Sequence, residues 1–550
     1  VSKGMVWQFT TRKAGDFDGD DAVGYEDFRL LTVDWLAQGG VIADADGDGN
    51  CNMVDYALWA KNLSGTTYYV DSVGGSDTNL GTSVSQPWKT VAKANSVTLG
   101  PGDKLLFKAG SVYTGVQFKP KGKGANGAPV IIDMYGQGNK PLFEGQGLVS
   151  PVVYIYNMEY IEVGNFEVTN TGPTRVAGRK GVSFTLGDYG VGHHVYARNL
   201  FIHDVNGSLS KDEGGGIGLH FGAGGYFHPR SCYEDVLIEG CHLLRCDRDG
   251  MVIGFGYSGR FAWYPGHNIR VRNNLLEDIG GDGIIIFASD GAVVEYNVLD
   301  GGRTRCADWA AGIWPCGADN TIVQYNEVCN MVGTNDGEAF DDDGGCQGSI
   351  FQYNYSHDND GGFLLECGGY DVEDIGSRNM IVRYNISQND GDHTGASTRG
   401  GLSLYSDSVN DQIYNNIFYI DSEFSIDFIE FIHNGSNSQP GFKFYNNIFF
   451  SDGIANYRYN QGFSNYIFSN NVFYGTHTNL PTSSNSIFTN PLLMGIGTGG
   501  NGLDTVSGYM LQNASPCINA GTTINNNGGY DFWGNILYNG NTDIGVEEKP

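Results

Sequence analysis

The sequence lacks any run of about 18 apolar residues, so nothing in it predicts a membrane-spanning helix. It is also poor in basic residues, because 32 Lys and Arg stand against 62 Asp and Glu and give a net charge of −30. That imbalance argues against nucleic acid as a partner, since its phosphates would be repelled. No signal peptide is recognisable, so we expect a mature or trimmed secreted chain that works outside the cell.

The ten cysteines lack the spacing of a zinc site, because neither a CxxC pair nor a His-spaced pair occurs. They are compatible with disulfides in a secreted protein, whose pairing the sequence does not define. By contrast, glycine (83 residues) and aromatic residues (13%) are abundant. This composition favours a turn-rich all-β protein whose exposed rings can face sugars.

Two acidic segments, residues 16–27 and 44–55, have the spacing of calcium-binding loops. Each places oxygen-bearing side chains at loop positions 1, 3, 5 and 12, and Ca²⁺ is a hard cation that takes oxygen ligands. We therefore expect Ca²⁺ as a cofactor. The predicted ligands are Asp16, Asp18, Asp20 and Asp27 in the first loop and Asp44, Asp46, Asp48, Asn52 and Asp55 in the second.

A helix-like run follows each loop, FRLLTVDWLA after the first and YALWAKNL after the second. Two such units resemble a dockerin, a module that docks enzymes onto cohesins. The resemblance implies a small α-helical, dockerin-like calcium-binding module over residues 1–63 with a cohesin-like partner. Loop positions 10 and 11 hold Tyr25, Glu26, Met53 and Val54 rather than the small hydroxylated pair of cellulosomal dockerins. Intramolecular docking onto the rest of the chain is therefore an equal alternative.

A short phrase repeats from residue 162 to 474, in forms such as VRNNLLE, VEYNVLD and FYNNIFF. Its asparagine recurs from Asn274 to Asn471 at spacings of 23, 29, 28, 31, 31, 31 and 24 residues, and we align it with the earlier Asn165, Asn199 and Cys241. A repeat of this length with alternating β-branched and aromatic residues predicts a solenoid. Asparagines stacked from coil to coil predict a parallel β-helix with an inward ladder.

Segments at both ends of the repeat, YYVDSVGGSDTNLGTSVSQPWKTVAKAN (68–95), PGDKLLFKAG (101–110), SPCINAG and TDIGVEE, resemble the pectate-lyase-like superfamily. The resemblance implies an all-β, right-handed parallel β-helix over 64–550, with an N-terminal cap over 68–100 and a closing segment over 490–550. It also implies an extracellular carbohydrate-active enzyme. It does not define the reaction, because the fold carries hydrolases, lyases and phage tailspikes.

One pair of carboxylates interrupts the pattern of the second strand of each coil. Aligned on the glycine that opens this strand, the fourth residue faces outward, and it is Asp341 in one coil and Glu366 in the next. Stacked strands lie about 4.8 Å apart. Glycosidases need such a pair, one acid protonated and one ionised. Asp343 points the same way, and Asp342 replaces Asp341 if the register slips by one, so these four are the predicted catalytic residues.

The expected substrate-binding residues surround that pair. Trp314 and Tyr405 lie one coil before and one coil after it, where their rings would form platforms for pyranose faces. Arg399 begins the following coil and would pair with an anionic sugar group. His357 and His220 are further candidates, although a hydrogen-bonded turn histidine is the alternative interpretation of His357.

Three functions stay open. The first is a secreted glycoside hydrolase acting on a polysaccharide through Asp341 and Glu366, which the net charge favours. The second is a polysaccharide lyase in which Ca²⁺ on residues 341–343 neutralises a uronate and Arg399 or His357 removes a proton. The third is a non-catalytic carbohydrate-binding or cell-surface β-helix, with residues 341–343 as a structural Ca²⁺ site or a solvated face.

Overall fold

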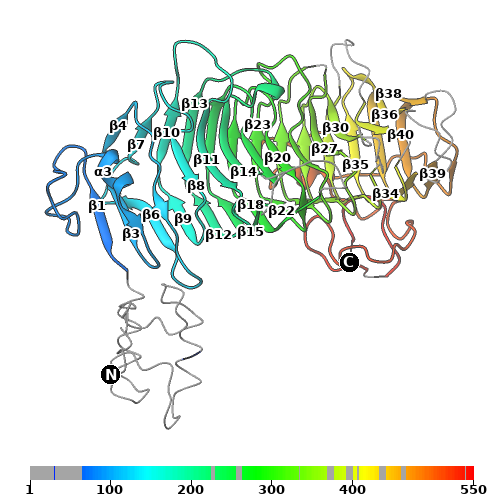
Figure 1. Cartoon of the computed structure of the whole chain (residues 1–550). Coiled ribbons are helices and arrows are strands. Elements are labelled where there is room, and N and C mark those ends of the chain that lie inside the picture. Colours follow the sequence, from blue (N-terminus) through cyan, green and yellow to red (C-terminus); the bar gives the residue numbers. More distant parts are fainter. Residues whose placement is uncertain are drawn as a thin grey trace, which may run out of the picture.

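A computed structural model describes residues 65–549, apart from 225–229, 256–262, 334, 368–376, 392–399, 406–407, 433–440, 460–465 and 539, and of the first 64 residues only position 30. The two predicted calcium loops lie outside the described residues. The described chain winds into one long stack of coils (Figure 1). Among the described residues, no helix is long and apolar enough to cross a bilayer.

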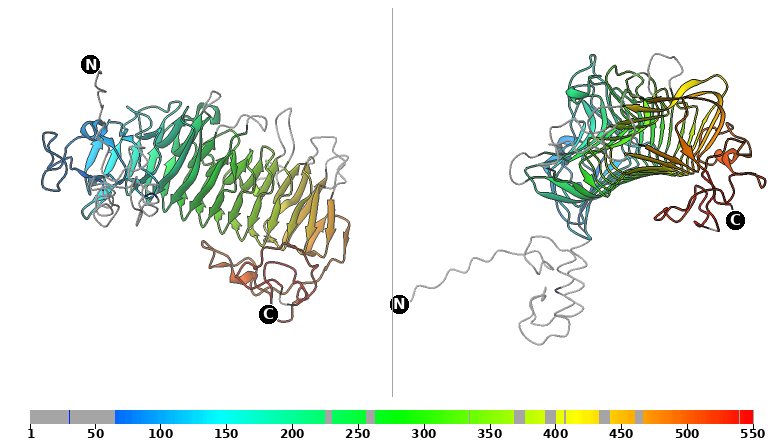
Figure 2. Two further views of the ribbon diagram at one scale, coloured as in Figure 1. Left: turned by 60° about the horizontal axis from the view of Figure 1, so that its bottom comes forward. Right: turned by 90° about the vertical axis from the view of Figure 1, so that its right-hand side faces the viewer.

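Two large parallel sheets run the length of the stack. Strands from successive coils pair in register, so a 16-stranded sheet forms one wall and a 23-stranded sheet forms the other two among the described residues. Apolar side chains from all three walls fill the interior, and most of them are fully buried. Figure 2 looks along the stack in its right-hand view and shows the walls enclosing this core. The prediction of a parallel β-helix is therefore confirmed.

The strands fall into three columns. The first sheet holds β1 (Thr67–Val70), β3 (Lys104–Lys108), β6 (Val130–Tyr135), β9 (Ile161–Gly164), β12 (Val191–Arg198), β15 (Cys232–Glu239), β18 (Gly266–Arg272), β21 (Ser289–Asp290), β22 (Val293–Glu295), β25 (Ile322–Gln324), β28 (Ile350–Gln352), β31 (Ile381–Arg383), β34 (Asp411–Tyr414), β37 (Phe442–Tyr445), β39 (Tyr466–Ser469) and β41 (Ser483–Ser484). One column of the second sheet holds β4 (Val112–Thr114), β7 (Leu142–Glu144), β10 (Glu167–Asn170), β13 (Phe201–Val205), β16 (His242–Cys246), β19 (Leu275–Glu277), β23 (Val298–Asp300), β26 (Glu327–Cys329), β29 (Tyr355–His357), β32 (Ile386–Gln388), β35 (Ile417–Ile420), β38 (Ile448–Tyr459) and β40 (Val472–Thr478). The other column holds β8 (Val153–Tyr156), β11 (Lys180–Gly187), β14 (Ile217–Gly224), β17 (Met251–Phe255), β20 (Ile284–Phe287), β24 (Ile313–Cys316), β27 (Glu338–Asp343), β30 (Gly362–Cys367), β33 (Leu402–Tyr405) and β36 (Ser425–Ile432).

Little helix accompanies the strands. The α-helix α3 (Val91–Ser96) lies in the predicted cap, where the Thr90 side chain accepts a hydrogen bond from the Lys93 amide at 3.1 Å and so caps the first turn. Two 3₁₀ turns, η1 (Lys211–Glu213) and η3 (Val506–Tyr509), and a small parallel pair, β2 (Thr98–Leu99) with β5 (Lys121–Gly122), complete the elements.

The predicted asparagine ladder is confirmed from Asn274 to Asn471. The backbone amide and side-chain amide of Asn354 both donate to Oδ1 of Asn385 at 3.0 Å, and the same pattern repeats from coil to coil. Further upstream the alignment was wrong by one residue. Asn165 and Asn199 have left-handed backbones at the turn, and the inward position after each is apolar.

Replacing Asn354 by Leu should lower the free energy of unfolding by about 1–3 kcal/mol. The substitution removes the acceptor for two donors of Asn326 and the donor for Asn385 and Val323, all inside the core. Urea unfolding followed by circular dichroism measures the loss. The same change at the exposed Asn513 should be nearly neutral. Equal stability of the two variants would contradict a structural role for the ladder.

The segment from residue 490 returns along the outside of the stack (Figure 2). It packs an apolar cluster of its own against the outer faces of β29, β32 and β35. Hydrogen bonds join it to the coils: Tyr353 Oη donates to the Tyr530 carbonyl at 2.8 Å, and Asn415 Nδ2 donates to the Gly545 carbonyl at 2.8 Å. The outer face of one wall is thereby covered, while the outer face of β24, β27 and β30 carries a cavity.

Candidate active site

The strand β27 carries alternating acids to opposite sides of the wall. Phe340 pairs with Ile313 and Leu364 in the core, so Asp341 and Asp343 point outward while Asp342 points inward. The predicted outward position of Asp341 and Asp343 is therefore confirmed.

The predicted partner of Asp341 was placed on the wrong face. Glu366 pairs with Asp342 and Leu404 in register, and both acids are fully buried. The error comes from the glycine alignment, because Gly362 pairs with Glu338 rather than with the glycine before it. Asp342 and Glu366 consequently face the interior of the β-helix, and the residue beside Asp341 on the outer face is Leu365.

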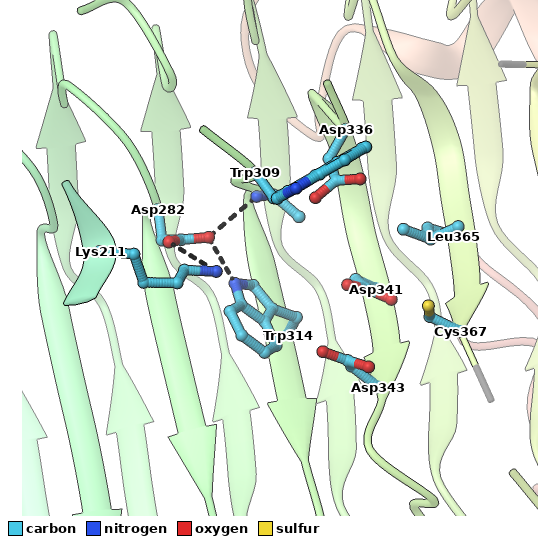
Figure 3. A pocket seen from close by; sticks show the side chains of 10 residues that line it. Lys211, Asp282, Trp309, Trp314, Asp336, Asp341, Asp343, Leu365 and Cys367 are labelled. Atoms are coloured by element: carbon cyan, nitrogen blue, oxygen red, sulfur yellow. Dashed lines mark hydrogen bonds and ion pairs between the residues drawn. The ribbon is translucent and has the colours of Figure 1, made fainter. Parts of the chain in front are cut away.

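A cavity of about 410 Å³ opens on this outer face. Asp341 and Asp343 from β27, Leu365 and Cys367 from β30, and Trp314 from β24 form its floor. The turns that precede the strands supply its rim: Lys211, Asp282, Trp309, Ala311 and Asp336. Figure 3 shows Asp336, Asp341 and Asp343 succeeding one another along one side, beside the two tryptophan rings.

One acid of the cavity is fully engaged by donors. Asp282 accepts hydrogen bonds from Trp314 Nε1, the Ala311 amide and Arg248 Nη1, each at 2.9 Å, and its carboxylate lies 3.5 Å from Lys211 Nζ (Figure 3). Burial raises the pKa of Asp282, but Lys211, Arg248 and these hydrogen bonds outweigh it, so the pKa is lowered. Asp282 therefore favours the ionised form, and the hydrogen bond that it accepts from Trp314 orients the indole ring. The ammonium of Lys211 lies 4.8 Å from the centre of the Trp314 ring.

The buried cation that pairs with Asp282 is Arg248, whose side chain has no exposure. It also bonds Asp249 Oδ1 at 2.7 Å and donates to the Trp309 carbonyl at 2.9 Å. Burial raises the pKa of Asp249 to about 7 against the attraction of Arg248. Arg248 therefore links the acids behind the cavity to the turn that carries Trp309.

The two outward acids of β27 hold protons unusually tightly. Burial, with the negative charges of Asp343 and Asp336, raises the pKa of Asp341 well above its ordinary value. Burial raises the pKa of Asp343 to about 7, although the Gly344 amide and Lys211 oppose the shift. The cavity therefore combines carboxylic acids with carboxylates at neutral pH, and acid–base catalysis requires such a combination.

Two further predicted site residues, His220 and His357, do not line this cavity. His220 lies on β14, where its Nδ1 pairs with Ser183 Oγ at 2.9 Å and burial lowers its pKa to about 3. His357 lies on β29, in a different column. Tyr405 ends β33, but its side chain, like the whole of Arg399, falls outside the described residues.

Among the cavity residues that the sequence interpretation missed are Lys211, Trp309 and Asp336. They belong to turns before the strands, where no repeat phrase marks a position and coil lengths differ. Asp336 carried a faint signal, because it stands two residues before Glu338 in an acid-rich segment.

No known protein-family profile matches the chain. A curated relative is the lacto-N-biosidase of Bifidobacterium longum subsp. longum, 29% identical over 610 aligned residues that cover 88% of this chain and 36% of that protein. The chain thus spans about a third of the length of the curated relative that it matches.

Solved structures show the same architecture. The native GH136 lacto-N-biosidase from Eubacterium ramulus is 27% identical, with a TM-score of 0.55, and the match covers 73% of this chain and 72% of that one. The complex of XylC with xylose has a TM-score of 0.50 at 11% identity, covers 88% of this chain and 98% of that one, and shows the fold alone.

Proposed function

We propose that the chain is a glycoside hydrolase and that the cavity on β24, β27 and β30 is its active site. Two kinds of support meet here. The similarity to lacto-N-biosidases favours hydrolysis of a glycosidic bond. The cavity supplies what that reaction requires, namely paired carboxyl groups beside aromatic rings that can pack against a sugar face.

Asp343 is the proposed proton donor. A general acid works best when its pKa lies near the working pH, and only a protonated group can protonate the leaving oxygen. The pKa of about 7 at Asp343 meets both conditions. At its neighbour Asp341, burial and the surrounding negative charges raise the pKa well above its ordinary value, which disfavours the ionised form that a base requires.

Asp336 is the proposed ionised partner, acting as nucleophile or as base toward water. It lies on the opposite side of Asp341 from Asp343 (Figure 3), and its negative charge contributes to the raised pKa values of both. Lys211 supplies a nearby positive charge. Asp282 is unsuited to either role, because its carboxylate already accepts three hydrogen bonds and faces a lysine.

The substrate class follows the named relatives. We propose that the chain hydrolyses a glycan that carries a lacto-N-biose unit. A cavity of about 410 Å³ has room for one or two sugar rings, which favours release of a small unit over cleavage within a long polysaccharide. The single observation that carries the proposal is the presence of Asp336 and Asp343 in one cavity with two tryptophans.

Incubation with chromogenic glycosides of lacto-N-biose, N-acetylglucosamine, xylose and galacturonate tests this. Release from the first alone supports the proposal. Ultraviolet absorbance of an unsaturated sugar, appearing when the chain is incubated with a 4-linked uronic-acid polymer, would instead support a lyase. The lyase alternative is weakened because His357, one of the two bases predicted for it, lies on β29 and does not line the cavity.

We further propose that residues 1–63 form a Ca²⁺-binding module of a secreted protein, docking either a cohesin-like partner or the chain's own β-helix. Calorimetric titration of the chelator-treated chain should show uptake of two Ca²⁺ with the ligands of the 16–27 and 44–55 loops. Asp16→Ala with Asp44→Ala should abolish it, while Asp342→Asn should not. Uptake lost only on the Asp342 change would contradict the module.

A further inference from the structure

A second cluster of chemically active side chains lies away from the cavity, in the column of β26 and β29. Glu327 and Cys329 project from β26, and His357 projects from β29, where Cys329 and His357 pair in register. One potential metal-binding atom of each residue lies within 4.8 Å of the others. All three residues are buried, with 4%, 1% and 3% exposure. The proposed hydrolysis does not use them.

The geometry of the cluster matches that of a small tetrahedral site. Glu327 Oε1 and His357 Nε2 are 3.2 Å apart. Two ligands with bonds of about 2.0–2.1 Å to zinc are separated by roughly 3.3 Å across a tetrahedral angle. The two atoms thus already have the spacing that a shared ion would impose. The other ring nitrogen, Nδ1, lies 2.8 Å from Asp358 Oδ2, so Nε2 is the nitrogen directed at the cluster.

Each of the three side chains also has an outer partner. The Gly502 amide donates to Glu327 Oε1 at 2.8 Å, and Asn330 Nδ2 lies 3.6 Å from Cys329 Sγ. Asp358 holds the imidazole of His357. Outer hydrogen bonds of this kind, above all a carboxylate behind a histidine, orient the ligands of metal sites.

We propose that Glu327, Cys329 and His357 bind a zinc ion. A thiolate, an imidazole and a carboxylate are the donors that zinc prefers, whereas calcium takes oxygen alone. Three protein ligands leave one tetrahedral position, which a water molecule would occupy. A divalent cation would also compensate the negative charge of a buried thiolate and of the Glu327 carboxylate, which lies 3.2 Å from His357 Nε2.

The site would fasten the returning C-terminal segment to the β-helix. Gly502 contacts Glu327, and three residues earlier Gly499 exchanges hydrogen bonds with Gln388, whose Oε1 also accepts from Tyr509 Oη at 2.7 Å. These partners lie on strands β26 and β32, on either side of His357. We therefore assign the ion a structural role, separate from the proposed hydrolysis.

Cobalt provides a spectroscopic probe of the thiolate. The full chain, freed of metal with a chelator and kept in excess Ca²⁺ to fill any oxygen-ligand sites, is titrated with Co²⁺. A thiolate-to-cobalt absorption band should saturate at one equivalent and disappear on addition of Zn²⁺. Cys329→Ser should abolish the band, and His357→Gln should weaken binding by at least about tenfold. The matched control Cys306→Ser removes another buried thiol and should leave the band unchanged.

Zinc should also raise the Tm of the wild-type chain and protect residues 495–510 from proteolysis. Both effects should be lost in Glu327→Gln, a variant that keeps the side-chain shape and serves if Cys329→Ser does not fold. The proposal is overturned if no thiolate band appears, or if Cys329→Ser retains it. It is equally overturned if zinc raises the Tm of wild type and Glu327→Gln alike, because zinc then stabilises the chain from a site that does not include Glu327.

Discussion

Asp343→Asn should reduce kcat on the lacto-N-biose glycoside by roughly 10³-fold while the chain stays folded. The amide keeps the shape of the carboxyl group but cannot give a proton to the leaving oxygen. An aglycon that leaves without protonation should therefore be cleaved with a much smaller loss. Steady-state kinetics with two glycosides of different leaving-group acidity measures the difference. A uniform loss with both would contradict the role of Asp343 as the acid.

The pH profile gives a second test of the same residue. An acid with a pKa of about 7 is protonated below that pH, so wild-type activity should decline as the pH rises through about 7. The raised pKa also means that ionised Asp343 costs stability, since the native state favours the proton between the ordinary value and about 7. Asp343→Asn should therefore be more stable than wild type above pH 7, and the two should converge in acid.

Amide variants compare the acids that line the cavity with an acid that faces the interior of the β-helix. Asp336→Asn should lose about as much activity as Asp343→Asn, because each of the two roles is essential. Glu366→Gln, an acid of the neighbouring strand that faces the interior, should retain activity. Proton NMR of the product as it is first released shows whether the anomeric configuration is retained or inverted. Retention would make Asp336 the nucleophile, and inversion would make it the base toward water. Full activity of Asp343→Asn together with an inactive Glu366→Gln would contradict the assignment of Asp343 to the outer face and of Glu366 to the interior.

The sequence predicts the structure well where the same short pattern of residues repeats in every coil. The ladder from Asn274 to Asn471 follows from a fixed phrase and was predicted to the residue. The face to which a side chain points is harder to predict, because side chains alternate between the two faces at every residue. A single misaligned glycine was enough to place Glu366 beside Asp341 when it pairs with Asp342.

The remaining residues of both sites come together only through the register between coils. Trp309 and Lys211 lie almost a hundred residues apart in the sequence, in turns of different length, yet both line the cavity. Cys329 and His357 escape any zinc-spacing rule for the same reason. They are one coil apart, so that stacking of β26 on β29, rather than a short loop, brings them together. Spacing rules for metals assume ligands within one turn or helix and do not apply between coils.

Arg248→Met should cause the largest loss of stability, about 3–5 kcal/mol in the free energy of unfolding, because it removes the cation from a fully buried cluster of acids. Asp282 would keep Lys211, whereas Asp249 would lose its direct partner. The Trp309 carbonyl also loses a donor, so activity should fall with stability. Urea unfolding followed by tryptophan fluorescence measures the first effect.

The pH dependence identifies the cause of that loss. Arg248 lowers the pKa of Asp282, so it contributes stability that is present above the ordinary carboxyl pKa and lost as the pH falls through the lowered one. The deficit of Arg248→Met should thus be largest at neutral pH and shrink in acid, where protonated acids need no cation. Arg245→Met serves as the control. It breaks a half-exposed pair with Asp204 and should cost less than about 1 kcal/mol. A deficit of Arg248→Met that is constant from neutral to acidic pH would mean that lost packing, not the buried charge, is responsible.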